Sequence, residues 1–281
     1  MEFTSAEGEQ RWAALVRAAA TTVVGLDFDG TLSPIVDDPA LAHIHPDASD
    51  VLVALAEQVA AVAVITGRPA RQALDLGGLE EVGQAVGDAG NELYLFGQYG
   101  NERWTSTERR IISPRPPHGL SSFLRDLPRL LRGAGAQDAY VEEKGLAVAV
   151  HTRRLEDAAG AYERLLPEVR ELAGRHELVV EPGRNVIEVR SPGMHKGLAV
   201  SRLVEEVDAG GFLFAGDDLG DLEAFDAVAA LAEGGMPTLL VCSASEEQSA
   251  LVEHADVVVK GPEGVLGLLR QLTIEARDLR A

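Results

Sequence analysis

Short apolar runs alternate with amphipathic segments along much of this chain of 281 residues. The pattern predicts buried strands at residues 21–27, 62–66, 210–218 and 237–243. It predicts helices at residues 47–59, 69–76, 220–232, 246–254 and 261–274. Strands that are continuously apolar and separated by helices are typical of a parallel sheet covered on both faces. We therefore predict an α/β fold.

The middle of the chain follows a different pattern. From about Trp104 the sequence turns basic and proline-rich, as in a linker. Beyond it, helices are predicted at residues 121–132 and 155–174, and strands at 138–143, 145–153, 176–182 and 185–191. These strands come in two closely spaced pairs, which indicates a small antiparallel sheet with helices on one face. We therefore predict a parallel-sheet core formed by residues 1–103 and 191–281, interrupted by an inserted α+β domain at residues 104–190.

Composition and charge narrow the class of protein. Hydrophobic residues make up 46% of the chain and charged residues 25%, which is typical of a globular protein and excludes dominant disorder. The formal charge of −20 argues against nucleic acid and anionic membranes as partners. A single cysteine, Cys242, excludes an internal disulfide and favours a reducing compartment. The N-terminus is unlike a signal peptide and no apolar run is long enough to cross a bilayer, so we expect a cytoplasmic location.

Two carboxylates follow the first predicted strand at alternate positions, Asp27 and Asp29, and Gly30 after them permits a sharp turn. In open parallel sheets the active crevice lies outside the carboxyl ends of the strands. Two buried acids without a partner are costly, and a divalent cation would compensate both. The alternative is an Asx turn that caps the next segment, which accounts for one aspartate but not for the other.

A second group of acids lies at the end of the predicted strand at residues 210–218 and consists of Asp217, Asp218 and Asp221. Asp218 or Asp221 is also placed to cap the helix that follows, so this group is ambiguous when taken alone. Together with the acids after the first strand it predicts a site of oxygen ligands. Such a site suits Mg²⁺, which is held by few carboxylates and a substrate phosphate.

Groups suited to an anion lie at similar places in the pattern. Thr66, Gly67 and Arg68 follow the apolar run at residues 62–65, and Lys196 begins a helical pattern. A hydroxyl, backbone N–H groups at a helix N-terminus and a lysine together bind a phosphoryl group, although each alone is more often a cap or a solvated side chain. Combined with the acids, they predict Mg²⁺-dependent phosphoryl transfer with an aspartate nucleophile.

Four motifs resemble those of the haloacid dehalogenase superfamily of phosphatases, namely DFDGTL, the threonine of VITGR, the lysine of MHKG, and GDDLGD. Over most of its length the chain is similar to the trehalose-6-phosphate phosphatases, in stretches such as VEEKGLAVAVHTR and VIEVRSPGMHKG. The resemblance implies a Rossmann-like core with an inserted cap domain, in agreement with the division inferred above. The chain departs from that family at Tyr99 in GQYGNE, where the family often has histidine.

The resemblance implies a role for each catalytic residue. Asp27 would be the nucleophile that forms an aspartyl-phosphate, and Asp29 would protonate the leaving sugar oxygen and then deprotonate the attacking water. Thr66 and Lys196 would bind the oxygens of the transferring phosphoryl group. Mg²⁺ would be held by Asp27, the backbone carbonyl of Asp29, and Asp217.

Supporting and sugar-binding positions follow from the same resemblance. Asp218 or Asp221 would act on the metal through water or orient Lys196, and Asp221 is preferred for that role. Arg68, after the second motif, would bind substrate or position its loop. Six polar side chains of the cap would bind the sugar: Glu142, Lys144, His151, Arg153, Glu188 and Arg190. The alternative for each is a side chain that only faces solvent.

The resemblance, together with the chemistry of these residues, implies an Mg²⁺-dependent phosphatase that hydrolyses trehalose 6-phosphate. Alternatives in the same class act on another phosphorylated disaccharide, a pseudo-disaccharide phosphate or a glycosyl-phosphoglycerate, because the cap selects the sugar. A phosphomutase and a catalytically silent sugar-phosphate-binding regulator are alternatives of other kinds. The expected partners are a small-molecule sugar phosphate and, through functional coupling, a glycosyltransferase.

Overall fold

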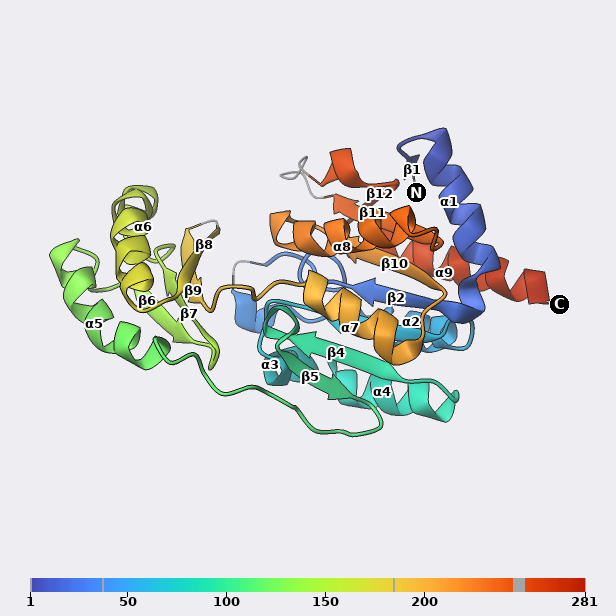
Figure 1. Ribbon diagram of the computed structural model, residues 1–281, viewed down its shortest axis with the longest axis horizontal. Helices are drawn as coiled ribbons and strands as arrows, with labels where there is room; N and C mark the ends of the chain where they lie inside the picture. Colours follow the sequence, from blue (N-terminus) through green and yellow to red (C-terminus); the bar gives the residue numbers. More distant parts are fainter. Residues whose placement is uncertain (1, 37, 184, 245–250, 281) are drawn as a thin grey trace. The chain divides into compact units, whose positions relative to one another are not determined.

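The computed structural model describes residues 2–36, 38–183, 185–244 and 251–280. They form two compact units (Figure 1). The core unit contains the chain up to Ser113 and from His195 onward, and the inserted unit is Pro114–Met194. The inserted unit therefore begins later and ends later than the predicted range of residues 104–190.

The first boundary lies later than predicted because residues assigned to the insertion form a strand of the core sheet. β5 (Glu102–Thr105) pairs antiparallel with β4 (Leu93–Gly97), and Trp104 lies opposite Leu95. Trp104 is 1% exposed and belongs to the hydrophobic core, so this segment is not a linker. Charged residues before and after Trp104 give this segment the composition of an exposed linker, although Trp104 itself is buried.

The core unit is built on one eight-stranded sheet, with the strand order β1-β12-β11-β10-β2-β3-β4-β5 in the described part of the chain. The inner strands are parallel, and the edge strands β1 and β5 are antiparallel to their neighbours. The remaining strands are β1 (Glu2–Phe3), β2 (Thr22–Leu26), β3 (Ala61–Ile65), β10 (Gly211–Gly216), β11 (Thr238–Ala244) and β12 (Val257–Lys260). This sheet confirms the predicted α/β class and contains every strand predicted for the core.

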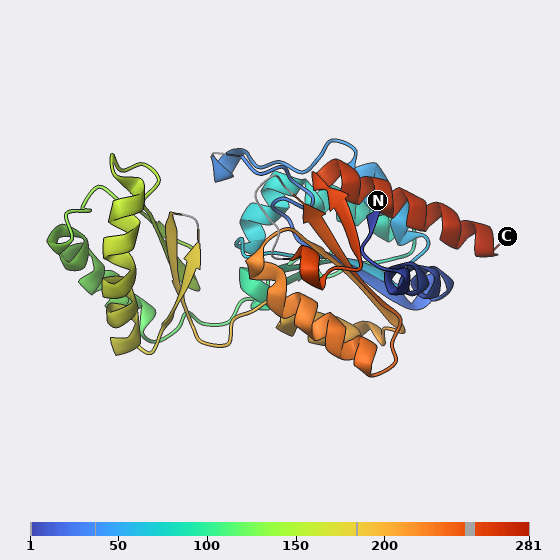
Figure 2. The same ribbon diagram turned by 90° about the horizontal axis from the view of Figure 1, so that it is seen from above.

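Helices cover both faces of the sheet (Figure 2). One face packs against α1 (Ala6–Arg17), α2 (Ala48–Ala56), α3 (Ala70–Gly77), α4 (Leu79–Asp88) and α9 (Gly261–Arg280). The other packs against α7 (Gly197–Val207) and α8 (Leu222–Glu233). Because both faces are covered, every residue of β2 and β3 is buried, which is why these strands are continuously apolar.

The helix predicted at residues 246–254 is tested only at its end. Residues 245–250 lie outside the described residues, and Val252–His254 form a short 3₁₀ helix. Among the helices that the structure describes, none combines the length and the hydropathy needed to cross a membrane.

The inserted unit contains a four-stranded antiparallel sheet in the order β6-β7-β9-β8. Its elements are α5 (Leu120–Gly133), β6 (Tyr140–Glu143), β7 (Ala147–His151), α6 (Ala158–Arg175), β8 (Val179–Gly183) and β9 (Val186–Arg190). Val148 and Ile187 pack against helix residues such as Leu127 and Leu165 in a separate hydrophobic core. The alternate strand residues occupy the opposite face. The predicted α+β insertion is confirmed.

Candidate active site

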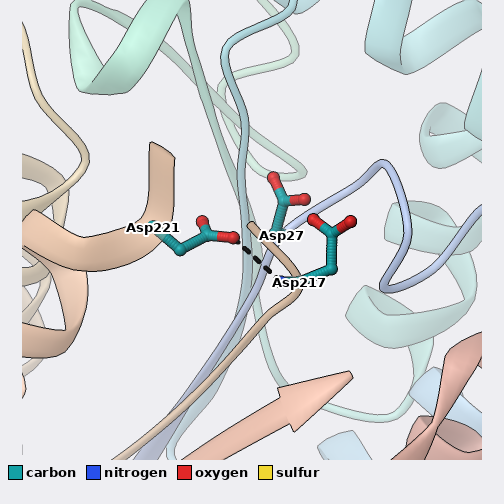
Figure 3. A group of neighbouring side chains, drawn as sticks. All are labelled: Asp27, Asp217 and Asp221. Atoms are coloured by element: carbon teal, nitrogen blue, oxygen red, sulfur yellow. Dashed lines mark hydrogen bonds between the residues drawn. The ribbon is translucent and has the colours of Figure 1, made fainter. Parts of the chain in front are cut away.

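Three aspartates meet at the carboxyl ends of neighbouring strands. Asp27 directly follows β2 and Asp217 directly follows β10, and these two strands are parallel neighbours. Asp221 ends a short 3₁₀ helix, η4 (Leu219–Asp221). Carboxylate oxygens of the three residues lie within 4.8 Å of one another, and all three residues are buried (Figure 3). Acids from two separate motifs thus form one group, which we call the acidic cluster.

Lys196, just before α7, brings a positive charge into the acidic cluster. Its Nζ donates to Asp27 Oδ1 at 2.5 Å and to Asp221 Oδ1 at 2.6 Å. The other oxygen of Asp221, Oδ2, accepts from the backbone N–H of Asp217 at 3.0 Å. Asp221 therefore orients both the lysine and the loop that carries Asp217.

Asp218 has a different environment. It is exposed, and its Oδ1 accepts from the backbone N–H of Gly220 at 2.8 Å, as an N-cap of η4. Of the two residues between which the sequence left the supporting role open, Asp221 is the one that contacts Lys196.

The acidic cluster places three carboxyl groups around one ammonium, that of Lys196. Burial raises the pKa of Asp27 well above its ordinary value, although Lys196 lowers it. Burial, together with the negative charge of Asp27, raises the pKa of Asp217 to about 9. Burial disfavours the charged form of Lys196, but the carboxylates beside it outweigh this effect and hold its pKa well above the ordinary value. When all three carboxyl groups are ionised, one ammonium leaves an excess of negative charge that a divalent cation would balance, so the oxygen donors of the cluster fit Mg²⁺.

The carboxylate of Asp29 is held by Arg68. Arg68 Nε donates to Asp29 Oδ2 at 2.7 Å and Nη2 donates to Asp29 Oδ1 at 2.6 Å, so the pair is bidentate. Arg68 Nη1 donates to the backbone carbonyl of Pro39 at 3.0 Å. The guanidinium predicted to bind substrate or position its loop is therefore directed at the protein, and it orients the carboxylate predicted to transfer the proton.

Thr66 follows β3, the other parallel neighbour of β2. It is 1% exposed, and its Oγ1 accepts from the backbone N–H of Arg68 at 3.1 Å. The Thr66 N–H donates to the carbonyl of Phe96 at the end of β4. The strand order thus brings Thr66 to the same sheet edge as Asp27.

Most of the polar side chains predicted to bind sugar are paired within the sheet of the inserted unit. Lys144 Nζ donates to Glu188 Oε2 at 2.6 Å, and His151 Nε2 lies 2.9 Å from Glu142 Oε2. Arg153 lies two residues beyond the end of β7 and is exposed.

Sheet register places the acids of these pairs in one row. Glu142 lies opposite Ala149 on β7, Ala149 lies opposite Glu188 on β9, and Glu188 lies opposite Glu181 on β8. Glu188 is 6% exposed, and its Oε1 has no hydrogen-bond partner among the residues that the structure describes. A buried carboxylate oxygen of this kind is suited to accept from a ligand hydroxyl.

Two further acids contact residues that were predicted to belong to the site or the loop that carries them, and neither was given a role from the sequence. Glu181 Oε2 accepts from Arg190 Nη2 at 2.7 Å, and the alternate positions of the second predicted hairpin were the signal for it. Glu102 Oε2 accepts from the backbone N–H of Ala70 at 2.6 Å, at the start of α3. It thereby fixes the loop that carries Thr66 and Arg68. The motif GQYGNE contains Glu102, but it did not indicate this contact.

Several proteins are similar to this chain in sequence. A trehalose-phosphate phosphatase of Mycobacterium tuberculosis is 31% identical over 225 residues, which are 75% of this chain and 52% of that protein. An alpha,alpha-trehalose-phosphate synthase (UDP-forming) of Dictyostelium discoideum is 28% identical over 264 residues, which are 92% of this chain and 31% of that protein. A protein of M. tuberculosis named as an uncharacterized glycosyl hydrolase is 35% identical over 73% of this chain and 15% of its own length. The chain spans about half or less of the length of these relatives.

Solved structures share the fold, and a family model covers most of the sequence. The C-terminal domain of Candida albicans trehalose-6-phosphate phosphatase matches with a TM-score of 0.75 at 19% identity, over 97% of this chain and 98% of that one. A haloacid dehalogenase-like hydrolase from Bacteroides thetaiotaomicron matches with a TM-score of 0.62 at 17% identity, over 89% of this chain and 99% of that one. The model for trehalose-phosphatase matches residues 25–115 and 130–257. The chain therefore belongs to the trehalose-phosphatase family.

Proposed function

We propose that this protein hydrolyses trehalose 6-phosphate to trehalose and phosphate, with Mg²⁺ as its cofactor. The observation that carries the proposal is the buried acidic cluster with Lys196 bridging Asp27 and Asp221, in a chain of the trehalose-phosphatase family. Buried charged groups without full compensation lower the stability of the folded protein. An enzyme gains activity from them, whereas a silent regulator gains nothing that offsets this loss. The complete set of charged groups therefore favours an enzyme.

Asp27 is the nucleophile of the proposed reaction. One of its carboxylate oxygens attacks phosphorus, and the bond between phosphorus and the sugar oxygen breaks as Asp29 gives that oxygen a proton. Both oxygens of Asp29 accept from Arg68 in this structure, so at least one of these hydrogen bonds must open before Asp29 carries the proton. Lys196 and the hydroxyl of Thr66 bind the phosphoryl oxygens and stabilise their charge.

The second half of the reaction restores Asp27. Asp29 takes a proton from water, whose oxygen attacks phosphorus, and the bond between phosphorus and the Asp27 oxygen breaks to release phosphate. Asp27, Asp217 and the backbone carbonyl of Asp29 would hold Mg²⁺. When bound, this ion neutralises the negative charge that the carboxylates and the phosphate bring together.

Sugar selection is proposed to reside in the inserted unit. The row of Glu142 and Glu188, with Lys144 and His151 paired to them, offers charged acceptors and donors to sugar hydroxyls. We also propose functional coupling to a glycosyltransferase that makes the phosphorylated disaccharide, since the matched Dictyostelium relative is named as a synthase of trehalose phosphate.

Phosphate release from a panel of substrates tests the proposed function. The panel contains trehalose 6-phosphate, sucrose 6-phosphate, glucose 6-phosphate and glucosyl-3-phosphoglycerate, each with and without Mg²⁺. We expect selective, metal-dependent turnover of trehalose 6-phosphate. Turnover of a different member would move the assignment to another sugar, and isomer formation without phosphate release would indicate a mutase. A folded protein that releases no phosphate from any member would favour the silent regulator.

Glu142→Gln and Glu188→Gln are expected to lower kcat/KM for trehalose 6-phosphate by about 10- to 100-fold, because a hydrogen bond to a charged group contributes about 1.5–3 kcal/mol. Hydrolysis of p-nitrophenyl phosphate, which carries no sugar, should stay unchanged. The matched control is Glu143→Gln, since Glu143 is the exposed neighbour of Glu142 on the opposite face of β6. Equal losses on both substrates would show that these acids support folding and not sugar recognition.

Mg²⁺ is expected to raise the thermal midpoint of the wild-type protein and to leave that of Asp217→Asn unchanged. A ligand at 100 times its Kd stabilises the folded state that binds it by about 2.7 kcal/mol, and the variant lacks one of the three clustered carboxylates. Differential scanning fluorimetry over a Mg²⁺ titration measures the effect. Asp218→Asn is the control that should respond like wild type, because Asp218 caps η4 outside the cluster. An Asp217→Asn protein that Mg²⁺ stabilises as strongly as wild type would contradict the assignment.

A further inference from the structure

A buried serine on a third strand holds the loop that follows Asp27 and Asp29. Ser243 lies near the end of β11, is 0% exposed, and its Oγ donates to the backbone carbonyl of Gly30 at 2.6 Å. β11 and β2 are not neighbours, because β10 lies between them in the sheet. The loop after β2 therefore reaches past the end of β10 to make this bond.

Gly30 belongs to this loop and lies directly against Asp217 of the acidic cluster. Its φ is +73°, and a Cβ at this position would lie 2.1 Å from Asp217 Oδ2. Only glycine tolerates both the left-handed backbone and the close approach. The Gly30 N–H donates to the carbonyl of Ser33 at 2.7 Å, so the residue is held on both sides, by Ser33 within the loop and by Ser243 from β11.

The bond from Ser243 fixes the spacing of groups that the cluster needs. Gly30 follows Asp29 in the chain and packs on Asp217, and both the serine hydroxyl and the Gly30 carbonyl are buried. A buried carbonyl that loses its donor pays the cost of desolvation or moves to find another partner. Loss of the hydroxyl would therefore let the Asp29–Gly30 turn shift relative to Asp217.

We propose that Ser243 is a positioning residue of the cation site, which holds the Asp29–Gly30 turn against Asp217 so that the backbone and carboxylate oxygens converge on a hard divalent cation. The cation class follows from the oxygen donors. Ser243 acts through Gly30 and contacts neither the substrate nor the ion. The inference deepens the proposed function, since the cation it serves is the one that this function requires.

Calorimetric titration with Mg²⁺ alone tests this inference without any substrate. Ser243→Ala is expected to bind Mg²⁺ about 10- to 100-fold more weakly than wild type, the usual effect of removing a group that orients metal ligands. The matched control is Thr273→Val, because the Thr273 hydroxyl is also buried and donates to a backbone carbonyl, that of Leu269 in α9, at 2.8 Å. This control should bind Mg²⁺ as wild type does, although it also loses one buried hydrogen bond.

A second variant separates positioning from folding. Ser243→Cys keeps nearly the same size but donates weakly, so its Mg²⁺ affinity should lie between those of wild type and Ser243→Ala. Thermal midpoints in the absence of metal show whether each variant is folded. Unchanged Mg²⁺ affinity in folded Ser243→Ala would overturn the inference, as would a wild-type protein that binds no Mg²⁺.

The two proposals fail in different ways. Wild-type protein that binds Mg²⁺ but releases no phosphate from trehalose 6-phosphate would overturn the proposed function, while a weakened titration in Ser243→Ala would still support the role of the serine. Wild-type turnover combined with an unchanged titration in Ser243→Ala would overturn the role of Ser243 alone.

Discussion

Replacement of Asp27 by asparagine is expected to abolish turnover of trehalose 6-phosphate, with kcat reduced by about 10⁴-fold or more. The amide keeps the size of the side chain, but it cannot attack phosphorus as a carboxylate does. The amide oxygen can still accept a hydrogen bond from Lys196, and Lys196 keeps Asp221 as its charged partner, so folding should be preserved. Single-turnover phosphate release with excess enzyme measures the effect.

Asp218→Asn is the matched control for this substitution. It makes the same chemical change at the N-cap of η4, in a side chain that is exposed and accepts from the backbone N–H of Gly220. We expect at most a small change in kcat, because an asparagine side chain also caps a helix. Residual activity of Asp27→Asn within tenfold of wild type would rule out Asp27 as the nucleophile.

Lys196→Met is expected to lower the free energy of unfolding by about 3–5 kcal/mol, the usual cost of removing one partner of a buried ion pair. Lys196 Nζ bonds to both Asp27 and Asp221, and the side chains of these three residues are at most 6% exposed. The methionine fills much of the space but leaves both carboxylates without their cation. Turnover should be lost as well, because the ammonium is the proposed ligand of the phosphoryl oxygens. Urea denaturation in the absence of Mg²⁺ measures the stability term.

The double variant Lys196→Met with Asp221→Asn separates stability from chemistry. Asp221→Asn removes one of the two carboxylates that Lys196→Met leaves without a cation. The double variant should therefore recover much of the stability that the single variant loses. Activity should stay lost, because no cation replaces Lys196 at the phosphoryl group. A single Lys196→Met variant as stable as wild type would show that the lysine does not compensate the buried acids.

The sequence predicted many of the features that depend on short, local patterns, although β4 and α1 were not among the predicted elements. Apolar runs ending in Asp27, Thr66 and Asp217 identified strands and their carboxyl ends, because a strand buried on both faces admits few polar residues before its end. The motifs then indicated the same sheet edge that the strand order β10-β2-β3 produces. The hairpins of the inserted unit were predicted for the same reason, since their turns and alternating positions are local.

Elements that depend on distant partners were not predicted. β1 has two residues and forms only because Phe3 pairs with Val257 of β12. β5 was assigned to a linker because its charged residues conceal Trp104, whose burial becomes evident only beside β4. Short segments of this kind carry too few residues for periodicity to reveal them, and their stability comes from neighbours brought together by folding.

By itself the sequence determined that carboxylates and a threonine lie at strand ends and a lysine at the start of a helix, and hence that these groups gather at one edge of a sheet. Only the tertiary structure decided their pairing: Asp221 and not Asp218 contacts Lys196, and Arg68 donates two hydrogen bonds to Asp29. It also placed the hydroxyl of Ser243 on Gly30 across an intervening strand. The physical reason is that strand ends follow from local apolar patterning, whereas hydrogen bonds between separate loops depend on distances that the packed sheet alone sets.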